Sequence, residues 1–323
     1  MEPLRLALIG FGNVGQGFMR VLSKTQVRCV VAAIATKRNG CRLFRDHQPP
    51  SQLADWLQEP HETLTLEELV AHPHIDVVIE TLPTDLDNPS NVMDIQTAAL
   101  RAGKHVITAN KGPAAHSYLA LAELARENHV IYGVEATVMS GTPAIQLIHA
   151  LQGAQIKRLQ GIFNGTSNFI LSQMEGGSQY ADALTEATRL GYAEPDPSAD
   201  VDGLDIRAKL MILAQVAFGV SHTTQDIQIA GIRDLDQRLV AETVAAGKRL
   251  KLVGLLDPKS ASVRLMSLPE TDPLARISGA TNGIAVTTEL LGTVSLIGPG
   301  AGAEETGTAL LVDLNRVLEV NHG

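Results

Sequence analysis

The chain has little cysteine: Cys29 and Cys41 are the only two among its 323 residues. Neither belongs to a Cys-x-x-Cys motif or to a Cys/His pattern with the spacing of metal ligands. The scarcity of cysteine favours a reducing compartment, so we expect a cytoplasmic protein without a cysteine-based metal site.

Runs of basic residues and long apolar segments are also missing. The formal net charge is -9, and Lys and Arg residues are nowhere clustered into a long run, which argues against nucleic acid as a partner. No segment reaches about 18 uninterrupted apolar residues, and no basic region precedes an apolar stretch near the first residue. We therefore expect neither a membrane span nor a secretory signal.

Apolar residues make up 45% of the chain, which is enough for a substantial core and for two domains. Short apolar runs alternate with helical patterns, and this predicts right-handed βαβ crossovers and a parallel sheet covered on both faces. We predict an α/β protein in which residues 1–134 form a Rossmann-type, doubly wound dinucleotide-binding domain. The expected strands are 4–9, 27–35, 75–80, 104–108 and 129–134.

The pattern changes after residue 134. Helical patterns at 143–151, 180–190 and 204–218 accompany a strand pattern at 157–163. We expect a second, α+β domain over residues 135–300. Residues 301–323 contain a further helical pattern, which we expect to return to the first domain.

Three glycines, Gly10, Gly12 and Gly15, directly follow the first expected strand. Glycines at this spacing permit a tight turn, a close approach to a pyrophosphate and close packing of helix on strand. The helix that follows offers free N–H groups to the phosphates. An ordinary glycine turn has the same composition, and the position after the first strand is what favours a dinucleotide site.

Lys37 and Arg38 stand where the second expected strand ends. An acidic residue there would bind the ribose 2′-hydroxyl of NAD, whereas basic residues accept the 2′-phosphate of NADP. We therefore predict a preference for NADP, with NAD also possible because the pyrophosphate contacts are shared. A solvated pair on a loop is the alternative, and the unassigned loop at 38–60 could displace this interpretation.

Two lysines are candidates for acid–base chemistry. Lys111 follows the fourth expected strand, at the edge of the sheet where ligands bind. Lys209 lies four residues after Asp205, a helical spacing that places both side chains on one face, where the carboxylate can stabilise the charged lysine. A solvated lysine and a surface ion pair are the alternatives, but the apolar residues around Asp205 predict a buried helix.

Several segments, in a fixed order across nearly the whole chain, carry the most specific signal. They are Gly-Phe-Gly-Asn-Val-Gly at 10–15, Thr-Ala-Asn-Lys-Gly-Pro at 108–113, Glu-Ala-Thr-Val-Met-Ser-Gly-Thr-Pro at 135–143, Asn-Gly-Thr-Ser-Asn-Phe-Ile at 164–170, Gly-Tyr-Ala-Glu-Pro-Asp-Pro-Ser-Ala-Asp-Val-Asp-Gly-Leu-Asp at 191–205 and Gly-Ala-Gly at 300–302. Together they resemble the homoserine dehydrogenase family, in its short form without a C-terminal regulatory domain.

The resemblance implies reversible NAD(P)-dependent oxidation of L-homoserine to L-aspartate 4-semialdehyde, in threonine and methionine biosynthesis. It implies that Lys209 transfers the proton at the substrate oxygen, with Lys111 close to the same oxygen and Asp205 orienting Lys209. The positions that match the family's substrate pocket are Glu194, Asp200, Asp205, Thr166 and Gly165.

The resemblance also implies a cofactor site, a cation site and a homodimer formed through residues 135–300, which would bind the substrate. The expected cofactor-binding residues are Gly10, Phe11, Gly12, Asn13, Val14, Gly15, Lys37, Arg38, Thr81, Lys111, Gly300, Ala301 and Gly302. The family holds a monovalent cation such as sodium, mostly by backbone carbonyls, and the matching positions are Glu135, Val138, Ser140 and Thr142.

Three other functions would have different residue requirements from those that this sequence meets. Another NAD(P)-dependent amino-acid dehydrogenase of this architecture would have no reason for the segment 191–209. A phosphorylating semialdehyde dehydrogenase needs a thiolate, and both cysteines lie in the nucleotide half. A catalytically inactive NADP-binding sensor would not need Lys111 and Lys209.

Overall fold

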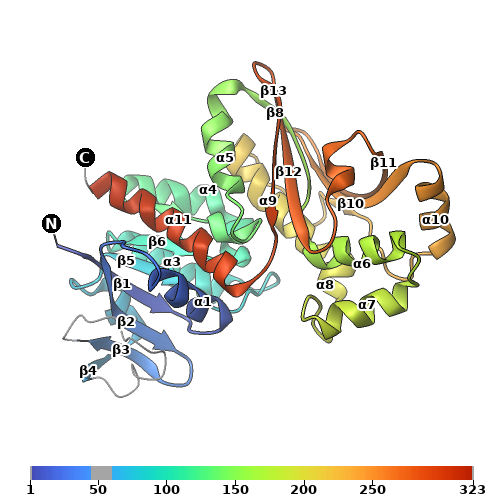
Figure 1. Ribbon diagram of the computed structural model, residues 1–323. Coiled ribbons are helices and arrows are strands. Elements are labelled where there is room, and N and C mark those ends of the chain that lie inside the picture. Colours follow the sequence, from blue (N-terminus) through green and yellow to red (C-terminus); the bar gives the residue numbers. More distant parts are fainter. Residues whose placement is uncertain (1, 45–59, 322–323) are drawn as a thin grey trace. The chain divides into compact units, whose positions relative to one another are not determined.

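The computed structural model describes residues 2–44 and 60–321, so most of the unassigned loop at 38–60 lies outside the described residues. The chain divides into two compact units, which Figure 1 shows. The first comprises Met1–Gly141 together with Gly302–Gly323, and the second comprises Thr142–Ala301. Within the described residues, no helix has both the length and the apolar character needed to cross a membrane.

The first unit is built on a seven-stranded sheet with the order β4-β3-β2-β1-β5-β6-β7. Five of its strands are parallel and correspond to the five expected from the sequence, so the predicted α/β fold class is confirmed. These strands are β1 (Leu4–Ile9), β2 (Cys29–Thr36), β5 (Val77–Glu80), β6 (His105–Thr108) and β7 (Tyr132–Gly133). The main connecting helices are α1 (Asn13–Leu22), α3 (Ser90–Arg101) and α4 (Lys111–Glu127).

The direction of winding reverses at β1, because β2 lies on one side of it and β5 on the other. In open sheets of this kind, ligands bind outside the carboxyl ends of the strands at the reversal. The structure therefore points to the ends of β1 and β5, where Gly10 and Thr81 follow Ile9 and Glu80.

Two strands of this sheet were not expected from the sequence. They are β3 (Gly40–Phe44) and β4 (His61–Leu64), which continue the sheet antiparallel beyond β2. Both are short and carry polar side chains, so they lack the continuous apolar run that marks a buried parallel strand. A helix, α2 (Leu66–Ala71), follows and begins with a capping box between Thr65 and Glu68.

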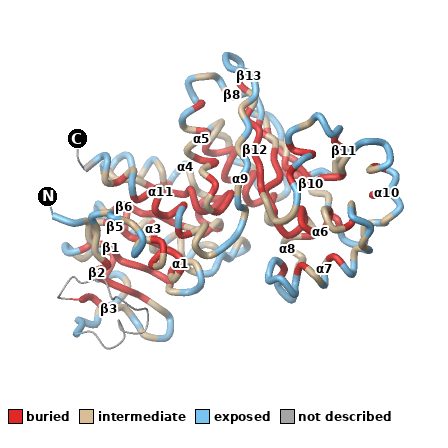
Figure 2. The backbone as a smooth tube through the Cα atoms, viewed as in Figure 1, coloured by how far each residue is buried: buried red, intermediate tan, exposed pale blue. Residues whose placement is uncertain are grey.

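The helix α11 (Ala303–Asn321) packs on α1 in the first unit. Its apolar residues join the same core as those of β1 and α1, and Figure 2 shows the central strands of this sheet as buried. The two helices approach closely because glycines stand at the crossing. A Cβ on Gly17 would lie 2.0 Å from the carbonyl oxygen of Ala303, and one on Gly307 would lie 2.7 Å from the backbone nitrogen of Phe18.

The second unit contains a six-stranded sheet with the order β13-β12-β8-β10-β11-β9. Its neighbouring strands are antiparallel except for the short β9, which runs parallel to β11. The strands are β8 (Ile156–Ile162), β9 (Gln228–Ile229), β10 (Lys248–Leu256), β11 (Ala261–Pro269), β12 (Thr281–Thr288) and β13 (Gly292–Pro299).

Helices of the second unit pack on this sheet and on one another. The helix α9 is largely buried and apolar on nearly all sides, as expected of a helix surrounded by other elements. Gly203 and Gly219, with φ of 79° and 64°, bound it in the left-handed region that glycine favours. The helices are α5 (Ala144–Leu151), α6 (Gly165–Glu175), α7 (Tyr180–Arg189), α8 (Ser198–Val201), α9 (Leu204–Phe218) and α10 (Gln237–Ala245).

Candidate active site

The glycine turn after β1 shows why each expected glycine is needed. Gly10 has φ 94°, and a Cβ there would lie 2.7 Å from the backbone of Thr81. A Cβ on Gly15 would lie 2.9 Å from the carbonyl oxygen of Gly10, whereas one on Gly12 would meet nothing within 4 Å. Gly10 and Gly15 therefore serve close packing, and Gly12 leaves open space beside the backbone where a pyrophosphate can approach.

The first turn of α1 presents backbone donors at this place. Gly12 is the N-cap, its missing side chain supplies no capping bond, and no acidic residue stands in the first turn. The N–H groups at the start of the helix, including those of Asn13 and Val14, can therefore bind phosphate oxygens. Phe11 is partly buried and packs against the core, so it fixes the turn. The residues fit a dinucleotide.

Lys37 and Arg38 are exposed in the turn between β2 and β3. Among the described residues, neither side chain makes a hydrogen bond or an ion pair. β2 is the neighbour of β1, with Ala35 paired to Ile9, so the two basic residues follow the strand next to the glycine turn. This is the position from which a 2′-phosphate is bound in such folds.

Two loops after β5 and β6 are tied to the glycine turn and to each other. The Thr81 hydroxyl donates to the carbonyl oxygen of Gly10 over 3.0 Å. The Asn110 side-chain amide donates to the carbonyl oxygens of Leu82 and Pro83, at 3.3 and 3.2 Å. Lys111, the first residue of α4, follows Asn110 directly. Sequence reasoning did not single out Asn110, because its partners lie in another loop.

The segment at residues 300–302 is divided between the units, since Gly300 and Ala301 end the second unit and Gly302 begins the returning part of the first. A Cβ on Gly300 would lie 2.2 Å from the Asn282 side chain, and one on Gly302 would lie 1.9 Å from that of Glu305. Packing against Asn282 therefore favours glycine at position 300, and the φ of 125° favours glycine at position 302, whatever their part in cofactor binding.

In the second unit, Lys209 and Asp205 form the ion pair that the sequence predicts. The Lys209 Nζ atom lies 2.7 Å from Asp205 Oδ2, and the two side chains are 9% and 12% exposed. Lys209 also donates to the carbonyl oxygen of Phe163 at the end of β8. The Phe163 ring packs closely against the backbone of Gly161 and Gly254, because a Cβ on either glycine would lie within 2.8 Å of the ring. The lysine is thus held in one orientation on a buried helix.

Asn164 joins the acidic residues of this site. Its side-chain amide donates to Asp200 Oδ1 at 2.6 Å and to Asp205 Oδ2 at 3.1 Å. Its side-chain oxygen accepts from the backbone N–H of Ser167, so Asn164 also caps α6. The sequence showed Asn164 only as part of a motif, because its partners come from distant positions. The structure assigns it the role of holding both carboxylates.

Burial raises the pKa of the Asp200 carboxyl. The hydrogen bond from Asn164 opposes this shift, the charge of Asp205 adds to it, and the charge of Lys209 opposes it. A carboxylate held in such a place is costly unless it interacts with a cation or a donor. The cluster is suited to binding a cationic group beside the lysine.

The remaining residues expected to bind substrate differ in their surroundings. The Thr166 hydroxyl donates to the carbonyl oxygen of Tyr192 at 2.6 Å, which ties α6 to the loop after α7. A Cβ on Gly165 would lie 2.7 Å from the carbonyl oxygen of Ala280. Glu194 is exposed in that loop, and within the described residues it forms no hydrogen bond or ion pair with the Lys209 cluster. The structure therefore brings together Lys209, Asp205 and Asp200, but not Glu194.

The expected cation ligands divide between the units. Glu135 opens a 3-10 turn (Glu135–Thr137), and its backbone N–H donates to the buried Asp313 at 2.8 Å. Ser140 has φ 52° and its hydroxyl lies 2.9 Å from that of Thr306 in the first unit, whereas Thr142 begins the second unit. In the part of the chain that the structure describes, no group of three or more His, Cys, Asp and Glu is arranged to hold a metal ion. That search concerns side chains, whereas the expected ligands, including Val138, are mostly carbonyls.

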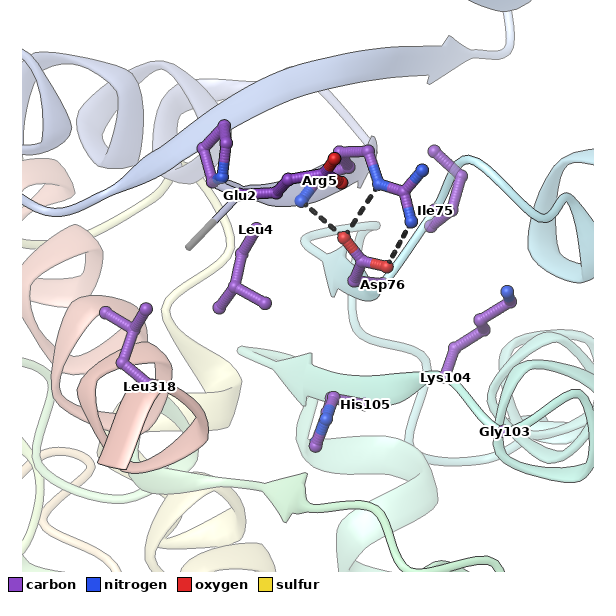
Figure 3. Close-up of a pocket in the computed structure, with 10 residues that line it drawn as sticks. Glu2, Leu4, Arg5, Ile75, Asp76, Gly103, Lys104, His105 and Leu318 are labelled. Carbon is purple, nitrogen blue, oxygen red and sulfur yellow. Dashed lines mark hydrogen bonds and ion pairs between the residues drawn. The ribbon is translucent and has the colours of Figure 1, made fainter. Parts of the chain in front are cut away.

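A pocket of about 370 Å³ lies elsewhere in the first unit (Figure 3). It is formed around the starts of β1, β5 and β6, with Arg5 and Asp76 joined by a 2.7 Å ion pair beside Lys104 and His105. This is the amino edge of the sheet, opposite the edge that carries Gly10. The pocket is therefore not part of the candidate active site.

Comparison with known proteins assigns both parts of the chain to one family. Residues 10–135 match the model described as the NAD binding domain of homoserine dehydrogenase, and residues 143–314 match the homoserine dehydrogenase model. A curated relative, an NAD(+)-dependent homoserine dehydrogenase from Pseudomonas canavaninivorans, is 36% identical over 337 residues, covering 97% of this chain and 96% of the relative.

Solved structures agree with this assignment. A putative homoserine dehydrogenase from Archaeoglobus fulgidus superposes with a TM-score of 0.88 at 31% identity, covering 97% of this chain and 99% of the other. A hyperthermophilic archaeal homoserine dehydrogenase in complex with NADPH gives a TM-score of 0.84 at 28% identity, covering 98% of each chain. The chain therefore belongs to the homoserine dehydrogenase family, whose members are NAD(P)-dependent oxidoreductases that act on a CH-OH group.

Proposed function

We propose that the chain oxidises L-homoserine to L-aspartate 4-semialdehyde, reversibly, with Lys209 as the residue that exchanges the proton of the substrate hydroxyl. The observation that carries this proposal is the buried Lys209–Asp205 pair, held beside Asp200 by Asn164. A buried ion pair contributes little to the stability of a fold, so a role in the chemistry would account for this pair.

NAD(P), when bound, would supply the hydride acceptor for the carbon that bears the hydroxyl, and the protein would supply orientation and proton transfer. In the oxidative direction Lys209 must be neutral to take the hydroxyl proton, so we expect faster oxidation at alkaline pH. In the reductive direction the ammonium stabilises the developing alkoxide and protonates it. Asp205 orients Lys209 through its 2.7 Å contact. The family resemblance is what supports a place for Lys111 near the same oxygen.

Substrate binding falls to the acidic residues. The amino group of homoserine is a cation, and Asp200 lies in a cluster with an excess of carboxylate. Glu194 is an exposed carboxylate without a partner among the described residues, so it is available to bind the amino group. Thr166 and Gly165 would shape the same pocket.

We propose NADP as the preferred cofactor, with NAD also accepted. The support is the exposed Lys37 and Arg38 pair after β2. The Pseudomonas canavaninivorans relative is named as NAD(+)-dependent, and the archaeal relative is solved in complex with NADPH, so both forms of the cofactor occur among similar proteins. A monovalent cation at the carbonyls of Glu135, Val138 and Ser140 and at Thr142, a homodimer through the second unit and a cytoplasmic location complete the proposal.

The test is homoserine-dependent reduction of NADP and of NAD by the purified protein at alkaline pH, with Lys209→Ala as the paired variant. We expect turnover in the natural chain and a loss of about 100-fold or more in the variant, as for removal of a general acid–base group. Cofactor binding without turnover on homoserine or on the semialdehyde would refute the proposal and favour the inactive sensor.

A second class of enzyme acts on semialdehydes with a cysteine thiolate as the nucleophile, and the surroundings of the two cysteines disfavour this chemistry here. Burial raises the pKa of the Cys29 thiol to about 11 and also raises that of Cys41. A nucleophilic cysteine needs the opposite shift. The lysine chemistry therefore stands as the conclusion.

A further inference from the structure

Glu80 is a fully buried carboxyl group at the end of β5, the strand next to β1. Among the described residues, no Lys or Arg forms an ion pair with it. Burial raises its pKa, although hydrogen bonds from Thr108, Leu82 and Gln96 act in the opposite direction. An acid in such a place costs stability, so its hydrogen bonds must accomplish something that an apolar residue could not.

The hydrogen bonds of Glu80 reach three separate segments. Oε1 accepts from the backbone N–H of Leu82 at 2.7 Å, in the loop after β5. Oε2 accepts from the Thr108 hydroxyl at 2.6 Å, at the end of β6, and from the Gln96 side-chain amide at 2.9 Å, on α3. Both oxygens of the carboxyl are thus occupied by donors.

The network continues into the loop that carries Lys111. The Thr108 hydroxyl oxygen accepts from the backbone N–H of Asn110 at 2.9 Å. Asn110 in turn donates to the carbonyls of Leu82 and Pro83 and accepts from Gly112 at 3.0 Å. Glu80 therefore lies where both loops begin. It directly precedes Thr81, whose hydroxyl donates to the glycine turn, and it is linked to Asn110, the residue before Lys111, by two successive hydrogen bonds through Thr108.

We propose that Glu80 is a positioning residue for the cofactor and for Lys111, because its buried carboxylate fixes the loops after β5 and β6 in one arrangement. The inference rests on the proposed function for the role of Lys111, whereas NAD(P) binding follows from the family. Glu80 is fully buried, so it acts through Leu82, Thr108 and Asn110 and touches no ligand.

Because donors face both side-chain oxygens of Glu80, both atoms at these positions must be hydrogen-bond acceptors. In Glu80→Gln, one acceptor becomes an NH₂ group that faces either the N–H of Leu82 or the amide of Gln96. Reversing the Gln96 amide would relieve this, but the Gln96 oxygen already accepts from the Tyr132 hydroxyl at 2.8 Å. The amide variant is nearly the same size as the acid, so it tests the bonds and not the packing.

An exchange of the two side chains should repair the network. In Glu80→Gln/Gln96→Glu, the amide oxygen at position 80 accepts from Leu82 and its NH₂ donates to the new carboxylate at position 96. That carboxylate also accepts from Tyr132, and the Thr108 hydroxyl lies 3.2 Å from the present Gln96 nitrogen, within reach as a further donor. The donors and acceptors balance again.

The experiment measures the Kd of NADPH by fluorescence together with kcat and the KM values for NADP and homoserine. We expect Glu80→Gln to raise the Kd and the KM for the cofactor by about tenfold and to lower kcat. This fold-change corresponds to the free energy lost when one buried donor is left unsatisfied. The KM for homoserine should change less. The double variant should return the Kd to within about threefold of the natural protein.

Asp313→Asn is the matched control, because Asp313 is an equally buried acid of the first unit that accepts from Glu135 and pairs with Arg316. It should lower the melting temperature and leave the Kd of NADPH unchanged. Two results would overturn the proposal: a Glu80→Gln variant that loses stability but not cofactor affinity, and a double variant that binds as poorly as the single one.

If Glu80→Gln fails to fold, Thr108→Val removes the link between Glu80 and Asn110 at constant shape. It should weaken NADPH binding in the same direction, and unchanged binding would count against the proposal. Failure of the proposed function looks different: the natural protein would bind NADPH without oxidising homoserine, and the comparison of Kd values would still be readable.

Discussion

Lys209 Nζ lies 2.7 Å from Asp205 Oδ2, one turn away on the same buried helix. Among the described residues, the other ion pairs within one helix have at least one side chain that is about a third or more exposed, as in Arg126 with Glu123, whose side chains are 73% and 54% exposed. Exposed pairs of that kind contribute little, whereas a buried pair must overcome the loss of hydration. The Lys209–Asp205 pair is therefore set apart by its surroundings and not by its spacing.

Replacing Asp205 with Asn should test whether the negative charge of Asp205 is needed to orient Lys209. Asp205→Asn keeps the shape but removes the negative charge beside Lys209, so we expect kcat for homoserine oxidation to fall by about 10- to 100-fold while the KM for NADP stays close to its natural value. Steady-state kinetics across alkaline pH would check this. A variant with unchanged kcat at every pH would show that the aspartate does not orient the lysine.

Asn164→Ala removes the donor shared by Asp200 and Asp205. We expect a rise of about tenfold in the KM for homoserine and a fall in kcat, since two carboxylates lose a hydrogen bond and become free to turn. The cap of α6 is lost as well, which costs about 1 kcal/mol. Asn164→Ser keeps a capping oxygen, so equal stability with poor kinetics in that variant would assign the effect to the carboxylates.

Lys37→Ala/Arg38→Ala tests the cofactor preference. The two side chains are exposed and unpaired among the described residues, so their loss should not affect folding. We expect the KM for NADP to rise by about tenfold or more and the KM for NAD to stay the same, because only NADP carries the 2′-phosphate. Arg28→Ala, an exposed residue just before the amino end of β2, is the control. Equal effects on both cofactors would refute the assignment.

Arg5 and Asp76 should make stability depend on pH. Burial tends to raise the pKa of Asp76, but the side-chain and backbone hydrogen bonds from Arg5 outweigh it, so the pKa lies below its ordinary value. A lowered pKa stabilises the fold above the pKa of the unfolded chain, and this stability is lost as pH falls through the folded value. Asp76→Asn should therefore cost about 1 to 2 kcal/mol at pH 7 and much less near pH 3. Urea unfolding at both pH values measures the difference, and an equal loss at the two values would contradict the role of the charge.

The sequence predicted those features that a local pattern of residues determines. Apolar runs predicted the parallel strands, because strands buried on both faces leave no polar positions. The spacing of Asp205 and Lys209 predicted their contact, because a helix fixes it locally. The strands β3 and β4 were missed because they are short antiparallel strands with polar residues, which carry no such run.

Residues that act by joining distant segments were harder to find. Asn164 bonds to positions 36 and 41 residues away, and Glu80 bonds to a position 28 residues away. Nothing local distinguishes such an amide or acid from a surface residue. Their roles follow from strand order and register, which set Glu80 beside Thr108.

The crossing of α1 and α11 has a consequence for the protein during its synthesis. The first unit needs Gly307 and the apolar face of α11 to cover α1, yet the ribosome makes these residues only after the whole of residues 142–301. At a usual elongation rate that interval lasts on the order of ten to thirty seconds. We therefore expect the nascent chain to carry an uncovered α1 while the second unit is folding, and the nucleotide site to mature last even though its glycine turn is translated first.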